Sequence, residues 1–174
     1  MENSIEIEIK AKVESIKEIE NRLTELKALF KEKTVEEDHY YQHPCRDFQR
    51  TDEALRIRIS GNRYFVTYKG PKIDKDTKAR AELEIKIDNP EPYNRLFEQL
   101  GFKEAGMVLK TRKTYTFRDC SIMLDSVNEL GEFVEIECFG NFEECKKSIF
   151  DTAALLKINS FERRSYFELI NNKK

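Results

Sequence analysis

Strict alternation of charged and apolar residues is the feature that most constrains the fold of this chain. The stretch "IEIEIKAKV" (5–13) shows it first. Because successive side chains of an extended chain point to opposite faces, Glu6, Glu8 and Lys10 share one face and the apolar residues share the other. The same pattern returns in "ALRIRIS" (54–60), "RYFVTYK" (63–69), "RAELEIKI" (80–87), "VLKTRKTYTF" (108–117) and "EFVEIECF" (132–139).

The charged faces allow two interpretations. One is a twisted antiparallel sheet whose polar side meets water. The other is a sheet that curls until the charged face lines a barrel, with helices over the apolar outside. Because the charged face recurs on six predicted strands, we favour the barrel, in which buried charges must pair with each other or with a charged ligand and metal ions. The charged positions are Glu6, Glu8, Lys10, Arg56, Arg58, Lys69, Arg80, Glu82, Glu84, Lys86, Lys110, Arg112, Glu135 and Glu137.

An internal repeat sets the number of elements. "EIEIK" (6–10) recurs as "ELEIK" (82–86), and "NRL" recurs at 21–23 and 94–96. Each copy reads as a strand, a helix and three strands. We therefore predict an α+β fold with a closed eight-stranded antiparallel barrel and flanking helices, built from two related halves. The spacing predicts helices over 15–30, 89–102, 142–158 and 160–170, a strand over 35–41 and a hairpin at Gly61-Asn62.

Composition bounds the setting. The 174 residues fit one domain, and 31 basic against 33 acidic residues give no bias toward nucleic acid or membranes. The sequence shows neither a membrane-length apolar run nor a secretory signal, so we expect a cytoplasmic protein. The cysteines are Cys45, Cys120, Cys138 and Cys145. They form no C-x-x-C pair, which predicts reduced thiols and, with two histidines, no zinc site.

The predicted lining suits a phosphate-rich ligand. Several Lys and Arg side chains can neutralise several phosphates, and Arg contacts phosphate oxygens in a bidentate manner. Carboxylates in pairs supply the oxygen ligands that Mg²⁺ or Mn²⁺ prefers. No G-x-x-x-x-G-K-[ST] loop is present, which excludes a P-loop protein. The residues therefore predict a metal-assisted triphosphate or polyphosphate site.

The motifs also resemble a known family. "EIEIK" matches the E-x-E-x-K signature of the CYTH superfamily, or triphosphate tunnel metalloenzymes, and the resemblance extends through "HPCRDF", "TDEALRIR", "TYKGPKIDKDTKARAELE", "KTRKTY", "LDSVNELGEFVEIE" and "SYFELI". The resemblance implies one such domain over 1–174. It also implies Mg²⁺ or Mn²⁺ as cofactor, ATP or another triphosphate as partner, and a possible homodimer. By that resemblance the catalytic residues are Glu6, Glu8 and Lys10, the metal site uses Glu6, Glu8, Asp125 and one or both of Glu135 and Glu137, and the triphosphate ligands are Lys10, Arg56, Arg58, Lys69, Arg80, Lys110 and Arg112.

Two activities follow from the resemblance, and a third function lies outside it. We favour a class IV adenylyl cyclase, which converts ATP to cyclic AMP and pyrophosphate, because the cyclase-like motifs match best. The alternative is a triphosphatase acting on thiamine triphosphate, inorganic triphosphate or a nucleotide. A non-catalytic polyphosphate or nucleotide sensor ranks last, because it would be expected to lose the metal carboxylates.

Some residues keep two interpretations. Glu82 and Glu84 are either internal partners of Lys and Arg, which we favour, or a second metal locus; we expect Lys86 in an internal carboxylate pair. Packing at the barrel rim is expected for Tyr40 and Tyr41, and a surface position for His39 and His43. The loop "KIDKDTK" (72–78) is most simply a solvated hairpin tip, and its alternative is a lid over the tunnel.

Overall fold

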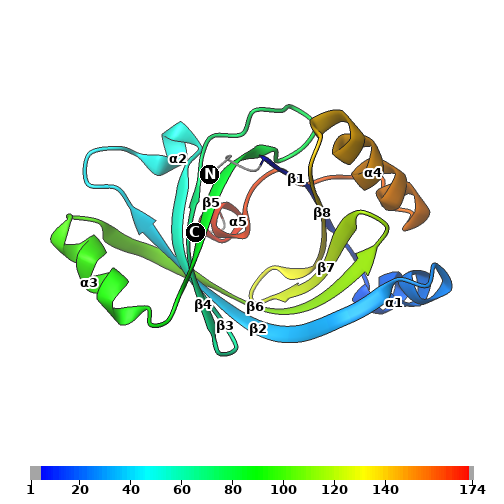
Figure 1. Cartoon of the computed structure of the whole chain (residues 1–174), viewed down its shortest axis with the longest axis horizontal. Coiled ribbons are helices and arrows are strands. Elements are labelled where there is room, and N and C mark those ends of the chain that lie inside the picture. The colour runs from blue at the N-terminus through cyan, green and yellow to red at the C-terminus, as the bar shows by residue number, and fades with distance from the viewer. Residues whose placement is uncertain (1–4, 173–174) are drawn as a thin grey trace.

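The computed structural model describes residues 5–172. Its strands are β1 (Ile5–Lys12), β2 (Leu29–Gln42), β3 (Ala54–Ser60), β4 (Arg63–Lys69), β5 (Arg80–Ile87), β6 (Lys103–Phe117), β7 (Cys120–Val127) and β8 (Gly131–Phe139). Its helices are α1 (Ile16–Glu25), α2 (Phe48–Thr51), α3 (Glu91–Gln99), α4 (Phe142–Leu155) and α5 (Tyr166–Asn171). The strands close into an antiparallel barrel, seen nearly end-on in Figure 1, which confirms the predicted fold.

The strand order shows how the two halves combine. Around the barrel it runs β1-β5-β4-β3-β2-β6-β7-β8. Strand β1 pairs with β8 of the second half from Glu6 to Lys12, and β5 pairs with β4 of the first half. The first strand of each half, β1 or β5, therefore pairs with the last strand of the other half. The two resulting four-stranded sheets, β5-β4-β3-β2 and β6-β7-β8-β1, join along a long β2–β6 ladder and along a short β1–β5 contact limited to Ile5–Ala81 and Glu6–Arg80.

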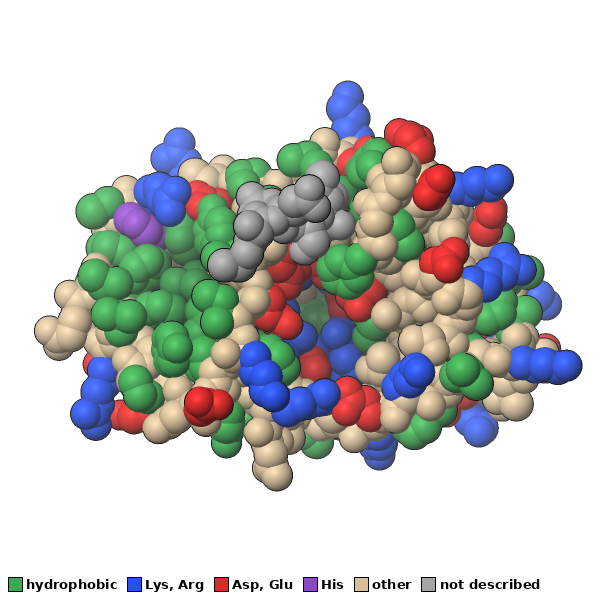
Figure 2. Space-filling model, in the orientation of Figure 1, with side chains coloured by type: hydrophobic (Ala, Val, Ile, Leu, Met, Phe, Trp, Pro, Cys, Tyr) green, Lys and Arg blue, Asp and Glu red, His purple; other side chains and the backbone are tan. Residues whose placement is uncertain are grey.

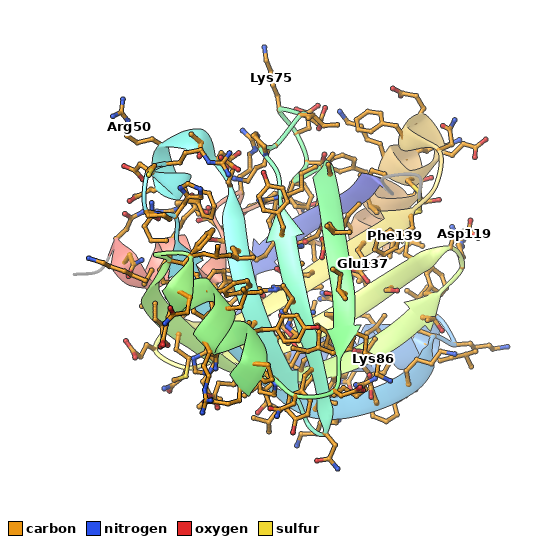
Figure 3. The ribbon with its side chains drawn as sticks, turned by 60° about the vertical axis from the view of Figure 1, so that its left-hand side comes forward. Arg50, Lys75, Lys86, Asp119, Glu137 and Phe139 are labelled. Carbon is orange, nitrogen blue, oxygen red and sulfur yellow. A yellow bond between two sulfur atoms is a disulfide. The ribbon has the colours of Figure 1, made fainter. Side chains whose placement is uncertain are left out.

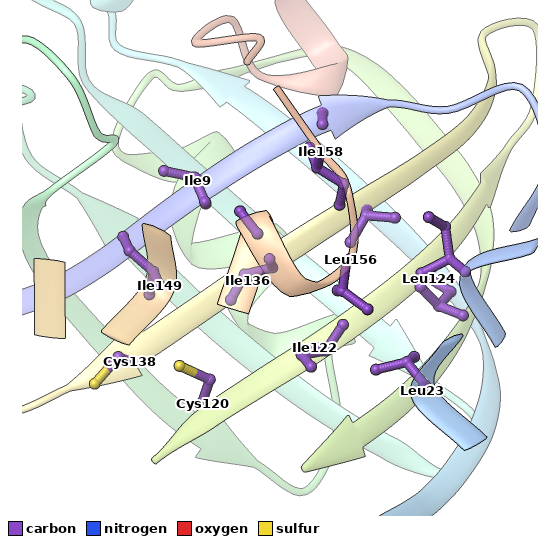
Figure 4. Packing of buried hydrophobic residues seen from close by; sticks show 14 of the residues in the cluster. Ile9, Leu23, Cys120, Ile122, Leu124, Ile136, Cys138, Ile149, Leu156 and Ile158 are labelled. Atoms are coloured by element: carbon purple, nitrogen blue, oxygen red, sulfur yellow. The ribbon is translucent and has the colours of Figure 1, made fainter. Parts of the chain in front are cut away.

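The apolar outer faces of the strands carry the helices. Side chains of β1, β7 and β8 pack with α1 and α4 into the largest core cluster, which includes Ile7, Leu23, Ile136 and Ile149, each at most 1% exposed (Figure 4). A second cluster joins the outer faces of β2 and β3 to α2 and α3. The short helix α5 packs at one end of the barrel through a third cluster around Tyr166. The charged faces are thereby left inside.

Three predicted boundaries are wrong. The helix predicted over 15–30 ends at Glu25, because Lys27 adopts a left-handed conformation (φ 59°) and the Ala28 amide donates to the Leu23 carbonyl. The apolar spacing continues to Phe30, but that residue already belongs to β2, which begins before the predicted 35–41. In the predicted helix over 160–170, only the turn after Ser165 is helical, where the Ser165 hydroxyl and the Glu168 carboxylate form a capping box.

The thiol prediction is also wrong in part. Cys138 and Cys145 form a disulfide, with their Cα atoms 5.4 Å apart, while Cys45 and Cys120 are free. The turn from β8 into α4 brings the pair together, and the sequence gives no C-x-x-C spacing to indicate it. Across residues 5–172, the helices are all too short or too polar to cross a membrane.

Candidate active site in the tunnel

The barrel encloses a cavity of about 920 Å³, within the size range of small-molecule sites. Figure 2 looks into it and shows acidic and basic side chains gathered in the hollow at the centre of the molecule. Of the predicted site residues, those on its wall are Glu6, Glu8, Lys10, Arg56, Arg58, Lys69, Arg80, Lys110, Arg112, Glu135 and Glu137. The structure thus brings together eleven of the twelve predicted positions; Asp125 lies behind the wall.

Strands β1 and β8 supply the acidic side of the cavity. Their register places Glu8 opposite Glu137 and Lys10 opposite Glu135. Burial raises the pKa of Glu6 and of Glu8, and nearby carboxylates raise the pKa of Glu8 further. Burial, reinforced by the charge of Glu6, also raises the pKa of Glu137 to about 8. Burial thus disfavours the ionised forms of these carboxyls, and a cation bound beside them would favour ionisation.

The basic side of the cavity is held by ion pairs. Arg58 binds Asp38 through two hydrogen bonds, from Nε (2.6 Å) and Nη2 (2.8 Å). The Lys110 ammonium lies 2.8 Å from Asp38 and 2.9 Å from Glu36. Although burial opposes ionisation, the charges of Arg58 and Arg112 lower the pKa of Glu36 to about 2. Asp38 and Glu36 thus hold these cations in place through ion pairs.

Arg112 links the basic and acidic sides. It donates to both oxygens of Asp125, at 2.7 and 2.5 Å, and its Nη2 also lies 2.5 Å from Glu135. The hydroxyl of Tyr166 donates to Asp125 at 2.9 Å. Asp125 is fully buried and positions Arg112; its predicted metal role stays a prediction.

Lys69 and Arg56 are held by the acidic residues of β5. Lys69 lies 2.8 Å from Glu6 and 2.6 Å from Glu82, and these carboxylates raise its pKa despite burial. Arg56 lies 3.6 Å from Asp38 and 4.0 Å from Glu84. Glu82 and Glu84 are therefore partners of Lys and Arg in this structure, as we favoured. Arg80 is buried opposite Glu6 and faces the cavity.

Lys10 meets the C-terminal segment. Its ammonium donates to the Arg164 carbonyl and lies 4.2 Å from the centre of the Tyr166 ring. The side chain is 1% exposed, and burial, together with the charge of Lys78, lowers its pKa to about 7. The position of Lys10, near the start of the chain, is thus fixed by contacts with Arg164 and Tyr166 near its end.

Sequence reasoning missed several residues of this wall. Lys78, the last residue of the loop predicted to be a solvated hairpin tip, is buried in the cavity and pairs with Glu8 and with Glu135 (3.5 Å). One signal was present, because the alternation of Arg80, Glu82 and Glu84 extends back to Lys78. Asp38 and Glu36 share an inward face by the same alternation in β2. Tyr166 carried no comparable signal.

Other expectations have clear outcomes. Lys86 is exposed on β5 opposite Phe65, so its predicted place in an internal carboxylate pair is wrong (Figure 3). Tyr40 stacks on Phe167 at 4.6 Å and Tyr41 packs edge-on against Phe97, as expected for packing at the rim. His39 lies between Glu37 and Glu104 on the outer side.

The acidic wall fits a hard divalent ion by its chemistry. Glu6, Glu8 and Glu137 offer carboxylate oxygens, and burial raises the pKa of all three, so a bound cation would favour their ionised forms. Within residues 5–172, no three acidic, His or Cys side chains converge into a ready-made metal site. Instead, Lys78 contacts Glu8 and Arg112 contacts Glu135, and these are two of the carboxylates that would bind a metal. The donor set is therefore suitable, although its oxygens are engaged with internal cations.

The family follows from comparison with known proteins. The CYTH domain family matches residues 4–166. This chain belongs to the CYTH family. A curated protein of Methanocaldococcus jannaschii named "Putative adenylate cyclase MJ0240" is 40% identical over 171 residues, covering 95% of this chain and 98% of the relative.

Solved structures share the CYTH tunnel. The PH1819 protein of Pyrococcus horikoshii superposes with a TM-score of 0.87 at 42% identity, covering 97% of this chain and 99% of that one. A protein from Hippeastrum reported to have a dominant triphosphatase activity has a TM-score of 0.70 at 19% identity, with 98% and 96% coverage. The latter likeness shows the fold alone.

Proposed function

We propose that this CYTH protein is a divalent-metal-dependent adenylyl cyclase that converts ATP to cyclic AMP and pyrophosphate inside the tunnel. The observation that carries the proposal is the division of one cavity wall into a row of cations and an acidic cluster, with Arg112 between them. Cations in a row match the oxygens of a triphosphate, and the carboxylates match a metal that neutralises and orients those oxygens. The name of the Methanocaldococcus relative supports the cyclase assignment.

The roles of the wall residues follow from their positions. Arg56, Arg58, Lys69, Lys110 and Arg112 would bind phosphate oxygens, with Arg80 as a further ligand. In this reaction the ribose 3′-oxygen loses its proton and forms a bond to the α-phosphorus. The bond from the α-phosphorus to the oxygen that bridges to the β-phosphate breaks, and negative charge grows on the leaving pyrophosphate. Arg and Lys already fixed by Asp38, Glu36 and Asp125 stabilise that charge without reorganising. Lys10 would place a further cation at the reacting phosphate.

An apolar end of the cavity supports a nucleoside head group. Tyr40 and Phe167, which stack on each other, line the cavity, and aromatic side chains can stack on bases. We expect Phe167→Ala to raise the KM for ATP while leaving the KM for tripolyphosphate unchanged. Equal changes for both substrates would contradict a head-group site there.

A triphosphatase is the second candidate, and the Hippeastrum neighbour favours it. The same wall would then assist water, in place of a ribose hydroxyl, in attacking a terminal phosphate. A non-catalytic sensor ranks last, because the carboxylates and the cations lie in the same cavity.

One experiment separates these functions. Purified protein is incubated with Mg²⁺ or Mn²⁺ and, separately, ATP, thiamine triphosphate and tripolyphosphate, and the products are separated by ion-exchange chromatography. Cyclic AMP with pyrophosphate supports the cyclase, whereas ADP with phosphate, or hydrolysis of tripolyphosphate, supports the triphosphatase. No turnover of any substrate, with tight binding of tripolyphosphate, would overturn both in favour of a sensor.

A further inference from the structure

Lys78 is a buried cation that the proposed reaction does not use. It belongs to the loop between β4 and β5, its side chain is 8% exposed, and its ammonium contacts Glu8 and lies 3.5 Å from Glu135. Both contacts are ion pairs between the ammonium and a carboxylate of the cavity wall. The ammonium therefore sits between two of the proposed metal ligands.

We propose that Lys78 is an internal counter-ion that holds the acidic wall together without metal and must leave it when a divalent ion binds. The inference rests on the proposed metal-dependent function. An ammonium and a divalent ion cannot both occupy the space between the same carboxylates, because the two positive charges would repel at close range in a buried site. Metal binding and the position of the Lys78 ammonium are then coupled, each opposing the other.

The comparison with Lys69 explains why Lys78 is the residue displaced. Lys69 also contacts a proposed metal ligand, Glu6, but it stands directly opposite a second partner, Glu82, on the neighbouring strand. It can keep Glu82 when Glu6 turns to a metal. Both acidic partners of Lys78 lie on the β1–β8 wall, so a metal there takes both.

The backbone around Lys78 supports a swing of the side chain alone. The Lys78 amide donates to the Glu8 carbonyl at 2.8 Å, which fixes the base of the side chain against β1. The preceding loop is anchored through Asp74, which accepts hydrogen bonds from Thr77 and from Lys146 of α4. A flexible four-carbon stem on a fixed base can carry the ammonium away from the carboxylates while the loop stays in place.

The test measures Mn²⁺ binding, without substrate, by isothermal titration calorimetry. We expect Lys78→Met to bind Mn²⁺ about tenfold more tightly than the wild type, because the competing cation is gone. Lys75→Met is the matched control: it removes the same charge from the exposed tip of the same loop (Figure 3). It should change the affinity less than about twofold, since an exposed charge is screened.

The outcomes separate this inference from the proposed function. Glu8→Gln should weaken Mn²⁺ binding in the wild-type background, and if it does not, the metal site itself is misassigned. If Glu8→Gln weakens binding while Lys78→Met binds no more tightly than Lys75→Met, the inference alone is wrong. Absence of binding by both the wild type and Lys78→Met overturns both.

Thermal stability, measured with and without metal, gives a second readout. Without Lys78, Glu8 and Glu135 lose a shared cation, so Lys78→Met should melt at a lower temperature than the wild type in chelator. Saturating Mn²⁺ should recover most of that loss, because an ion that binds only the native state stabilises it. A variant that Mn²⁺ does not restore would contradict the replacement of Lys78 by metal.

Discussion

The strands β1 and β5 carry the same repeated motif but occupy different environments. Both carry an acidic-apolar-acidic-apolar-Lys pattern, and they meet at the short seam that closes the barrel. Lys10 of β1 is 1% exposed, whereas its counterpart Lys86 of β5 is exposed. Position within the repeat therefore does not decide which copy becomes the site.

The burial of β1 and the exposure of β5 depend on which segments cover the free edge of each strand. Beyond the seam, β1 receives two backbone hydrogen bonds, from the Lys78 amide to the Glu8 carbonyl and from the Glu162 amide to the Lys10 carbonyl. Among residues 5–172 no comparable backbone bond covers β5 from Glu82 to Ile87. A loop and the C-terminal segment thus exclude water from one copy, and burial gives its charges perturbed pKa values.

The largest expected difference concerns the second acidic position. Glu8→Gln should lower kcat by about 100-fold or more, because it removes a charge from the proposed metal site while keeping the shape. The counterpart Glu84, whose side chain is 40% exposed, contacts Thr67 and Arg56, and Glu84→Gln should leave kcat within about threefold of the wild type. Steady-state assays with the best substrate decide this. Equal losses would mean that both copies carry chemistry.

The helices that follow the two strands extend the comparison. Leu23 of α1 is fully buried, while its counterpart Leu96 of α3 is 50% exposed. Leu23→Ala should lower the free energy of unfolding by about 2–5 kcal/mol through the cavity that it creates. Leu96→Ala should cost less than about 0.5 kcal/mol. Urea denaturation followed by circular dichroism measures both, and similar losses would show that α3 is covered in solution.

The lysines give a smaller contrast in turnover. Lys10→Ala should lower kcat more than about tenfold, since a cation at the reacting phosphate stabilises the transition state. Lys86→Ala should leave both kcat and the melting temperature close to those of the wild type, because the side chain is exposed. A catalytic loss at Lys86 equal to that at Lys10 would overturn the division of roles between the two strands.

The smallest effect is in the pH dependence of stability. Burial raises the pKa of Glu6, so above pH 4.5 the native state keeps a proton that the unfolded state loses, and stability falls as the pH rises toward the native pKa. At its counterpart Glu82, burial alone would raise the pKa, but a hydrogen bond with Glu6 and the charge of Lys69 lower it. Glu82 therefore contributes stability above pH 4.5 that is lost as the pH falls through its native pKa.

The two Gln variants should then differ in sign. As the pH rises from about 3 to 8, Glu6→Gln should gain stability relative to the wild type, and Glu82→Gln should lose it, each by about 2–4 °C in melting temperature. Thermal melts in chelator across this range provide the measurement. Shifts in the same direction would indicate that the two carboxyls titrate as one group.

The sequence predicted the barrel and most of its lining because the period-two pattern and the repeat are local signals. Inward-facing charges such as Arg56 and Arg58 follow directly from alternation. The environment of Lys86 could not be predicted in this way, because its exposure depends on which distant segments cover a strand edge. Lys78 was missed for the complementary reason: the chain enters the tunnel before the regular strand begins. The disulfide depends on a turn whose geometry no residue spacing reveals.

The contacts of Lys10 also impose an order on folding. Its strand β1 is among the first parts of the chain to be synthesised, yet β8, the Arg164 carbonyl and the Tyr166 ring, against which it lies, are among the last. Until those segments leave the ribosome, β1 lacks its β8 partner strand, Lys10 lacks the Arg164 carbonyl and the Tyr166 ring, and the outer face of β1 lacks α4. The nascent chain must therefore hold an unpaired amphipathic strand through most of its synthesis, which makes β1 the segment where chaperone binding is expected first.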